Sequence, residues 1–523
     1  MWPMQPKMKD PAREVVSLLP SVRLEPLYRR DQMVDCRLFL LGDRYRQLRR
    51  AYGEVIYRLS CCPDLQSSAA DVLQSAEIRQ YYDVVPSDSG LRLTLRDAAF
   101  REQYPLNSAD FTLRITTGSR TVTVPLPLER LRALGTMLPL LAGEHGETEI
   151  QAQLEETQEP DERQWSRDLL ATLDAQHCIV RRPVGPNSFQ VSQVRPRVTF
   201  VGHTSILLQT AGAAILTDPL FCIEFGSPAK AFDVTRLKLN AICCTHAHWD
   251  HCDVETLLRF DKRISVIIPR VHDATAFNPP IAPVLRRLGF KDIRELDPWE
   301  SVQLGDVEMI LIPFHGEQDE PEAKIDHYTY VYRTSALTLY GGVDAYRDTS
   351  ADMHDVLKRV RDNYCPSVAF LPISRMVFRY EHGGANGFCR YIDNTLLDKD
   401  FQYTAGPMEA AEWVQLLGVS TVVPYATFTF SRHRTPPEVN EFAVALDQKG
   451  MRSALLPLRP LDALDLRDLD GSAYARRRRR VLRWWHHAGA RAVRADQRLR
   501  QHAAYRLARR LLGAGSVSAR HHH

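Results

Sequence analysis

One short segment constrains this chain more than any other: residues 246–251 read His-Ala-His-Trp-Asp-His. The segment follows an apolar run, Ala241 to Cys244, that is typical of a buried strand. Histidines at positions i and i+2 of an extended loop project the same way, and the Asp and His after the next turn can reach a second ion. A buried histidine pair bonded to backbone carbonyls is the structural alternative, but it leaves the aspartate unexplained. The segment therefore predicts a metal site at a strand end.

Short β-branched or aromatic runs fill the region around this segment, and helical patterns separate several of them. The runs span 198–201, 205–209, 214–216, 241–244, 266–269, 307–312, 328–333, 337–340, 368–371 and 421–423, and helices are expected at 254–260, 353–363 and 408–417. Strands outnumber helices, and no Gly-rich phosphate loop follows the first strand. The pattern favours an α/β sandwich at residues 197–458 over a dinucleotide-binding fold.

Residues 1–190 mix strand and helix signals of a different kind. Alternating residues at 111–125 surround Thr117-Gly118-Ser119, which predicts a hairpin, and helical patterns follow at 128–141 and 164–180. This order indicates a smaller α+β domain. The segment has no spacing of metal ligands or of a nucleophile. We expect it to serve docking or dimerisation, and a homodimer is one assembly that it would allow.

The formal net charge of +3 hides a strongly basic C-terminal segment. Residues 471–520 hold fourteen arginines and a single acidic residue, Asp496, so the rest of the chain carries a net charge of −10. Apolar residues recur at helical spacing among the arginines, which predicts a basic amphipathic helical tail at 462–520. An acidic body argues against a general nucleic-acid binder.

Composition also bears on the compartment. With 44% hydrophobic and 25% charged residues, and without an apolar stretch of about 18 residues, the chain predicts no membrane span. The first ten residues lack the apolar run of a secretory signal. Ten cysteines without a repeated spacing indicate reduced thiols rather than a disulfide framework. We expect a cytoplasmic protein.

Two further segments carry a family resemblance. Residues 201–205 read Val-Gly-His-Thr-Ser and residues 216–219 read Leu-Thr-Asp-Pro. Together with the H-x-H-x-D-H segment they resemble the metallo-β-lactamase fold superfamily over about residues 198–450, in the branch of the N-acylphosphatidylethanolamine phospholipases and ascorbate-6-phosphate lactonases. The resemblance implies an αββα sandwich with a third ligand, a bridging aspartate and a last histidine after later strands. His203 and Asp218 would orient the histidine ligands from outside the metal site.

The ligands expected after later strands are assigned from single residues rather than from one continuous segment. His315 and Glu317 follow the run 309–313 and compete for the third ligand position. Asp344 follows two glycines at a strand end, where a bridging carboxylate is expected.

The last histidine is missing from its expected place. Residues 422–428 resemble the element that normally supplies it, but Ala426 stands there instead. Glu381 and His382, in a glycine-containing loop, are the candidate replacements.

A lost histidine and a gained Glu317 leave roughly three imidazoles and three carboxylates, which shifts the preference from zinc toward iron or manganese. With this change and its length, the chain resembles the diiron β-hydroxylases of nonribosomal peptide biosynthesis, of the chloramphenicol-pathway type. The resemblance implies that Glu317 and Asp344 are catalytic ligands. It assigns one iron to His246, His248 and Glu317, the other iron to Asp250 and His251, and the bridge to Asp344.

The same resemblance implies a reaction and its partners. Two irons, O2 and an external electron donor would hydroxylate the β-carbon of an amino acid. The substrate would be a phosphopantetheine-bound aminoacyl thioester on a peptidyl carrier domain of a nonribosomal peptide synthetase, and a reductase would supply electrons. Four aromatic residues are candidates for the aminoacyl pocket, although core packing is the simpler reading: Trp249, Phe314, Tyr380 and Phe388.

Two other functions stay open at the level of sequence. One is a dizinc hydrolase of a phosphodiester, lactone or thioester, with a bridging hydroxide as nucleophile, for which His315 would be the ligand. The other is nucleic-acid binding by the arginine-rich tail, which would imply a nuclease of the same superfamily. The acidic body disfavours the nuclease. The tail is expected to be a solvated helix face or a docking surface for an acidic carrier domain.

Overall fold

The computed structural model divides the chain into two compact units, residues 1–465 and 466–523. It describes the following residues, with short gaps inside some ranges: 14–28, 36, 39, 79, 82–95, 111–183, 196–220, 238–316, 326–374, 377–378, 392–393, 401–426 and 437–466. The predicted basic tail lies outside the described residues, apart from its first five positions.

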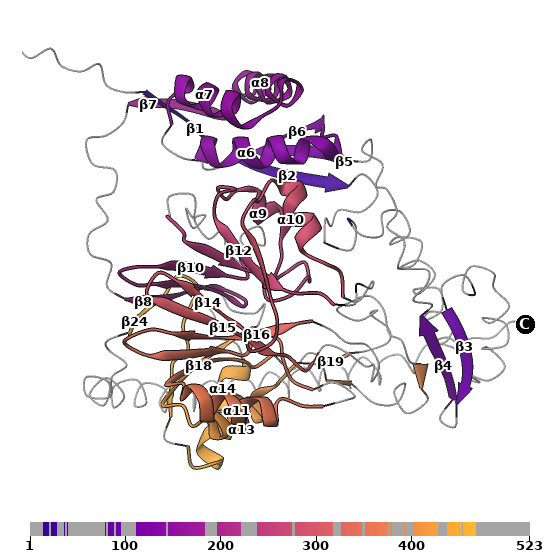
Figure 1. Ribbon diagram of the computed structural model, residues 1–523, viewed down its shortest axis with the longest axis vertical. Helices are drawn as coiled ribbons and strands as arrows, with labels where there is room; N and C mark the ends of the chain where they lie inside the picture. Colours follow the sequence, from indigo (N-terminus) through magenta and orange to yellow (C-terminus); the bar gives the residue numbers. More distant parts are fainter. Residues whose placement is uncertain are drawn as a thin grey trace, which may run out of the picture. The chain divides into compact units, whose positions relative to one another are not determined.

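Two seven-stranded sheets form the larger part of the first unit (Figure 1). The first sheet has the order β13 (Ile293–Leu296), β12 (Ser265–Pro269), β11 (Ala241–Cys243), β10 (Ala214–Thr217), β9 (Ser205–Gln209), β8 (Arg197–Gly202), β24 (Ala463–Asp465). The second has the order β14 (Ser301–Leu304), β15 (Val307–Pro313), β16 (Tyr328–Arg333), β17 (Thr338–Gly341), β18 (Val368–Pro372), β22 (Thr421–Tyr425), β23 (Ala454–Leu455). Because β24 pairs with β8, the sandwich extends beyond the end expected at residue 458.

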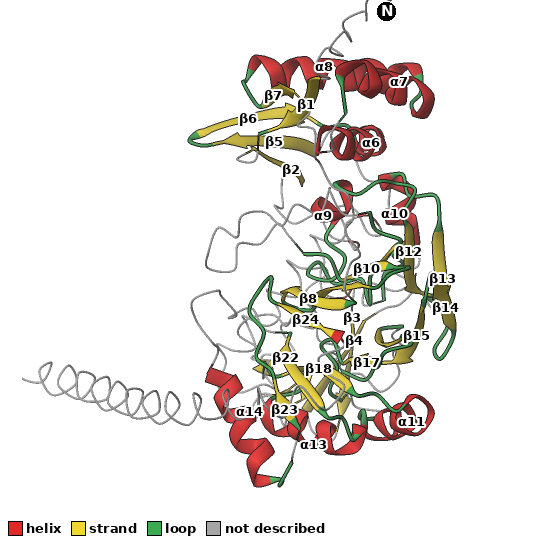
Figure 2. Ribbon diagram, turned by 90° about the vertical axis from the view of Figure 1, so that its left-hand side faces the viewer, coloured by secondary structure: helices red, strands yellow, loops and turns green. Residues whose placement is uncertain are grey.

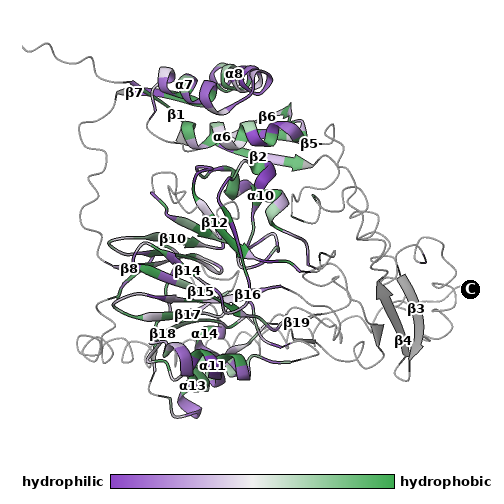
Figure 3. Ribbon diagram, viewed as in Figure 1, coloured by the Kyte–Doolittle hydropathy of each residue, from purple (hydrophilic) through white to green (hydrophobic). Residues whose placement is uncertain are grey.

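Helices cover the outer faces of both sheets (Figure 2). They are α9 (Val254–Leu258) and α10 (Ala282–Leu288) for the first sheet, and α11 (His354–Tyr364), α13 (Pro407–Leu417) and α14 (Pro437–Gln448) for the second. In Figure 3, α11 and α13 carry both polar and apolar residues, as expected for helices that bury one face. The arrangement is an αββα sandwich, which confirms the predicted fold class.

A smaller α+β part precedes the sandwich, also as predicted. Its strands pair in three small sheets: β1 (Glu14–Leu18) with β7 (Ile179–Pro183), β2 (Val22–Tyr28) with β5 (Phe111–Thr117) and β6 (Arg120–Pro125), and β3 (Tyr82–Ser87) with β4 (Gly90–Leu95). The last of these sheets also includes β20 (Ile392–Asp393), whose residues fall within the range of the sandwich. Its helices are a 3-10 turn (Leu128–Arg130), α6 (Leu131–Ala142), α7 (Glu147–Thr157) and α8 (Pro160–Ala175). A further short pair joins β19 (Val377–Phe378) to β21 (Phe401–Gln402).

In the α+β part, the predicted hairpin is present, and one of the predicted helices has different limits. Gly118 has φ +56° in the β5–β6 turn, a conformation that glycine adopts without steric cost. The helix expected at 164–180 is α8, which spans Pro160–Ala175. It begins earlier than expected because proline is favourable in the first turn of a helix. Ile179 and Val180 instead pair with β1.

Helix α6 packs closely against α9 and α10 of the sandwich. A Cβ atom on Gly135 would lie 2.6 Å from the Leu288 carbonyl oxygen, so the backbones approach too closely for any other residue. The buried Lys262 ammonium lies at the same contact and donates to the Leu257, Leu258 and Phe260 carbonyls. The α+β part and the sandwich therefore share one hydrophobic core. Among the described helices, none is both long and apolar enough to cross a membrane.

Candidate metal centre

Strand directions bring the candidate ligands to one edge of the sandwich. β10 and β11 are parallel, so Asp218 and the segment 246–251 follow carboxyl ends at the same edge. β9 is antiparallel to β10, which places the β8–β9 turn and His203 there as well. On the facing sheet β16 and β17 are antiparallel, so His327 precedes one strand where Asp344 follows the other.

Two groups of potential ligands result, and within each group the ligand atoms lie within 4.8 Å of one another. The first group consists of His246, His248 and His327, all buried. The second group consists of His203, Asp250, His251 and Asp344. The rings of His246 and His251 join the two groups, with centroids 3.9 Å apart.

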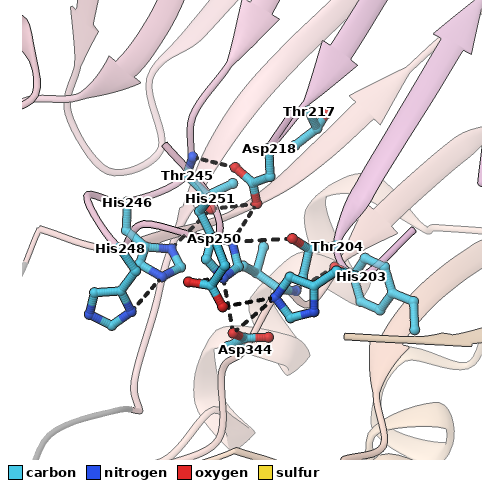
Figure 4. Close-up of polar contacts among 12 residues, drawn as sticks. His203, Thr204, Thr217, Asp218, Thr245, His246, His248, Asp250, His251 and Asp344 are labelled. Carbon is cyan, nitrogen blue, oxygen red and sulfur yellow. Dashed lines mark hydrogen bonds and ion pairs between the residues drawn. The ribbon is translucent and has the colours of Figure 1, made fainter. Parts of the chain in front are cut away.

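The second group is held by short polar contacts (Figure 4). His251 Nε2 lies 3.0 Å from Asp344 Oδ2, and His203 Nε2 lies 3.2 Å from Asp250 Oδ2. On its other side, His251 Nδ1 lies 2.9 Å from Asp218 Oδ2. Since a carboxylate only accepts, the imidazole nitrogens in these contacts carry hydrogens, and a metal ion would take the place of the Nε2 hydrogen that faces Asp344.

Asp218 is an anchor for the ligand loop as well as for the ring. Its two carboxylate oxygens accept hydrogen bonds from the Thr245 backbone N–H and hydroxyl, each at 2.8 Å. Its own backbone N–H donates to the Cys243 carbonyl at 2.7 Å. One buried carboxylate therefore fixes the end of β11 and the orientation of His251, the role expected for Asp218 from the sequence.

Burial and charge act differently in the two groups. Burial and the neighbouring imidazoles of His251 and His248 lower the pKa of His246 well below its usual range, so one ring nitrogen keeps its lone pair available. For His251 burial disfavours the charged form, but Asp250, Asp344 and Asp218 outweigh it and raise the pKa of His251 well above its usual range. His251 in the second group therefore favours positive charge, whereas His246 in the first group offers a neutral nitrogen donor.

Four backbone positions at this edge adopt positive φ without being glycine: His203 (+50°), Asp218 (+43°), Val343 (+50°) and Ala426 (+54°). Such conformations cost about 1–3 kcal/mol each and persist where the surroundings enforce them. Val343 is β-branched, which makes its conformation the least expected of the four. Its N–H donates to the buried Tyr425 hydroxyl at 2.5 Å, a contact that fixes the backbone just before Asp344. Strain at this edge is typical of a functional site.

The donor set fits metal ions. Imidazole nitrogens and carboxylate oxygens are ordinary ligands of zinc and iron, and each group brings at least three of them together in a buried place. Two carboxylates and two imidazoles packed at 3.0–3.2 Å also need a shared proton or cation between them. The described residues supply five imidazoles and two carboxylates, which is richer in nitrogen than the set expected from the sequence.

Five of the expected ligands lie in the two groups. His246 and His248 belong to the first group, and Asp250 and His251 belong to the second. Asp344, expected as a bridge between the two ions, lies in the second group. His315 is half-buried and belongs to neither group; its backbone N–H contacts Met353 Sδ.

Three further candidates, Glu317, Glu381 and His382, lie outside the described residues, and their roles stay predictions. Of the pocket candidates, Phe314 packs against His246 and His327 at 5.9 and 5.4 Å between centroids. Trp249 is half-buried, and Tyr380 and Phe388 lie outside the described residues.

Two members of the groups were not expected as ligands. His327 precedes β16, and no local spacing in the sequence links it to the segment 246–251. His203 was expected to orient a ligand from outside; instead its ring faces Asp250. Ala426, which stands where the family resemblance led us to expect the last histidine, donates its N–H to the His203 carbonyl at 3.0 Å.

Known proteins resemble this chain in two ways. Residues 197–362 match the family described as "Beta-lactamase superfamily domain". CmlA, a diiron β-hydroxylase from Streptomyces venezuelae, aligns in structure over 87% of this chain and 100% of its own, with a TM-score of 0.56 and 16% identity. The chain has a metallo-β-lactamase fold. The resemblance to the diiron β-hydroxylases noted in the sequence is thus confirmed as a likeness of fold.

Two sequence relatives point in different directions. A 4-amino-L-phenylalanyl-[CmlP-peptidyl-carrier-protein] 3-hydroxylase from Streptomyces venezuelae is 34% identical over 127 residues, 23% of this chain and 24% of that protein. A UPF0173 metal-dependent hydrolase from Methanopyrus kandleri is 22% identical over 269 residues, 50% of this chain and 97% of that protein. The match to the hydroxylase thus spans about a quarter of its length. This metallo-β-lactamase-fold enzyme has both hydroxylases and hydrolases among its relatives.

Proposed function

We propose that this protein is a diiron monooxygenase that hydroxylates the β-carbon of an amino acid bound as a thioester to a peptidyl carrier domain of a nonribosomal peptide synthetase. One observation carries the proposal: the structural likeness to the diiron β-hydroxylase covers 87% of this chain, including the α+β part. The hydrolase relative aligns with 50% of the chain. The stretch that is 34% identical to a carrier-protein hydroxylase supports the same reading.

The residues of the chain have definite tasks under this proposal. His246, His248 and His327 would hold one iron together with Glu317, which the sequence assigns to that iron. His203, Asp250, His251 and Asp344 would hold the other. A bound iron pair supplies the activation of O2 with two external electrons. Asp344 is proposed to bridge the two ions.

The surrounding residues would orient and shield this centre. Asp218 holds the His251 ring by its Nδ1 hydrogen, so that Nε2 would give its lone pair to the bound ion. Phe314 packs on the first group and excludes water from it. The α+β part, which shares its core with α9 and α10, would contribute to the surface that receives the carrier domain. A cytoplasmic location, with a reductase as electron donor, remains part of the proposal and rests on the cysteine pattern.

A dizinc hydrolase is the second candidate, and one observation favours it. The described donors are five imidazoles and two carboxylates, a set that suits zinc as well as iron. In that case the chain would hydrolyse an ester, thioester or phosphodiester with a metal-bound water as nucleophile.

The deciding experiment is a single turnover of chemically reduced, iron-loaded protein. The protein is mixed with a panel of aminoacyl-loaded carrier domains and ¹⁸O2, and the carriers are examined by intact-protein mass spectrometry. The proposal expects one ¹⁸O atom to be gained by one loaded aminoacyl group, with unloaded carrier as the control. Release of the amino acid from the carrier without gain of oxygen would support the hydrolase instead.

A further inference from the structure

Three buried cysteines surround the back of the metal-ligand loop. Cys36 belongs to the α+β part, and Cys244 and Cys252 bracket the segment 246–251; all three side chains are 0% exposed. The Cys36 and Cys252 sulfurs lie 3.7 Å apart. The Cys252 thiol also forms a hydrogen bond with Cys244. Sulfurs from two distant parts of the chain thus meet within one residue of a proposed ligand, His251.

The ligand loop has two faces with different neighbours. His246, His248, Asp250 and His251 point into the two ligand groups. Cys244, Ala247 and Cys252 instead belong to the hydrophobic core that the loop shares with the α+β part. A chemical change at the sulfurs therefore acts on the core-facing side of the loop and does not involve a ligand atom directly.

We propose that Cys36 and Cys252 form a redox-modification site, in which a disulfide ties the α+β part to the ligand loop. A disulfide has an S–S length of about 2.05 Å, so the sulfurs need to approach by roughly 1.7 Å. The cysteines are 216 residues apart in the chain, so the bond would fix a contact that only packing maintains in the reduced protein.

The chemistry needs a small oxidant because both thiols are buried. Hydrogen peroxide meets this requirement: two S–H bonds break, one S–S bond forms, and the two electrons and two protons reduce the O–O bond of peroxide to two waters. A natural source would follow from the proposed function, because an oxygen-activating centre that turned over without substrate would release peroxide on the other face of the ligand loop from Cys252. This choice of source rests on the proposed function, whereas the sulfur site does not.

Formation of the bond should weaken the second ligand group. Cys252 follows His251 directly, and the Cys252 backbone N–H donates to the His248 carbonyl at 2.8 Å. Drawing the Cys252 sulfur toward Cys36 shifts this turn, and with it the His251 ring between Asp218 and Asp344. We expect the oxidised protein to hold the ion of the second group about tenfold more weakly, in the range of changes beside metal ligands.

Peptide mapping tests the site on the full-length, metal-free protein. The reduced protein is treated with about one equivalent of hydrogen peroxide, unfolded in N-ethylmaleimide and digested without reductant. We expect a linked peptide pair that contains Cys36 and Cys252 and is restored to two thiols by dithiothreitol. Cys36→Ser should abolish the pair. Cys178→Ser should leave it intact, because that buried thiol donates to the Gln176 carbonyl instead.

Two results would overturn the assignment. One is a map in which Cys36 and Cys252 are alkylated while the exposed Cys365 is oxidised. The other is a bond between Cys244 and Cys252 in place of the predicted pair. A parallel sample of reduced, iron-loaded protein exposed to O2 without substrate separates this proposal from the function: if added peroxide links the pair and O2 does not, the sulfur site stands and the oxygenase loses support.

Discussion

The two ligand groups differ in chemistry and in how the fold supports them. The first is made of three imidazoles from the ligand loop and the start of β16. The second mixes two imidazoles and two carboxylates, and it is surrounded by anchors: Asp218 on His251, and Tyr425 behind Val343. Strained backbone is also concentrated around the second group, at His203 and Val343.

This difference suggests that the two groups depend on their surroundings to different degrees. Neutral imidazoles bind an ion through lone pairs and tolerate some variation in position. A buried carboxylate pair must be neutralised in a fixed geometry, and this explains why strained backbone and hydrogen bonds surround the second group. We therefore expect the second group to be the more sensitive to changes in its surroundings, and the first group to respond mainly to loss of its own ligands.

The largest expected effect comes from the third ligand of the first group. His327→Ala should reduce the bound metal from two ions per chain to one, because two imidazoles alone leave the ion weakly held. Metal analysis after gel filtration measures this, and His315→Ala serves as a control that keeps both ions. If His327→Ala retains both ions while Glu317→Ala loses one, the grouping of His327 is wrong and the ligand predicted from the sequence is right.

Loss of His203 should empty the second group selectively. His203→Ala removes the imidazole facing Asp250, and we expect more than about 100-fold weaker binding of one ion, since changes outside the ligands already cost about 10–100-fold. Titration with cobalt(II), followed by its visible absorption, resolves the two ions. His272→Ala, which alters an exposed histidine bonded to Asp297, should behave as the unaltered protein. Equal weakening of both ions would contradict the separate grouping.

Asp218→Asn should have a smaller effect of the same kind. The amide keeps the size of the side chain but loses one acceptor among its contacts with Thr245 and His251. We expect about 10–100-fold weaker binding of the second ion and little change for the first. Competition with a chelator measures both affinities. Unchanged binding of the second ion would show that Asp218 does not orient His251.

Tyr425→Phe should have the smallest effect. The change leaves the Val343 N–H without its acceptor in a buried place, at a cost of about 1–3 kcal/mol in the free energy of unfolding. Urea unfolding gives this value, and binding of the second ion should weaken more than that of the first. Tyr340→Phe is the matched control, because Tyr340 is fully buried as well, while the Val343 N–H donates to Tyr425 and not to Tyr340. Identical shifts in the two variants would remove the role assigned to Tyr425.

The sequence predicted the sandwich well because its strands are short and buried, so that each appears as a short run of apolar, β-branched or aromatic residues. The strand at 241–244 and the helix at 408–417 appear as β11 and α13 within a residue of the predicted limits. The ligand loop was predictable for a further reason: its ligands are consecutive, and local spacing alone brings them together.

Ligands that depend on tertiary structure were harder to predict. His327 joins His246 and His248 because β16 lies antiparallel to β17 at the same edge, a relation that no local pattern contains. His203 was recognised as part of a site, but its role depends on a left-handed backbone that turns its ring toward Asp250. Local sequence cannot show whether a histidine binds the ion or orients another ligand, because the backbone conformation of the turn determines where its ring points.

The nature of the bound metal tests the central claim most directly. The protein is supplied with equal iron(II) and zinc(II) without oxygen, freed of excess metal, analysed for bound metal and then exposed to O2 while uptake and visible absorption are recorded. We predict two irons per chain, one for each ligand group, with a visible absorption band and oxygen uptake once electrons are supplied. Two zinc ions per chain, a colourless protein and no oxygen uptake would contradict the assignment as an oxygenase.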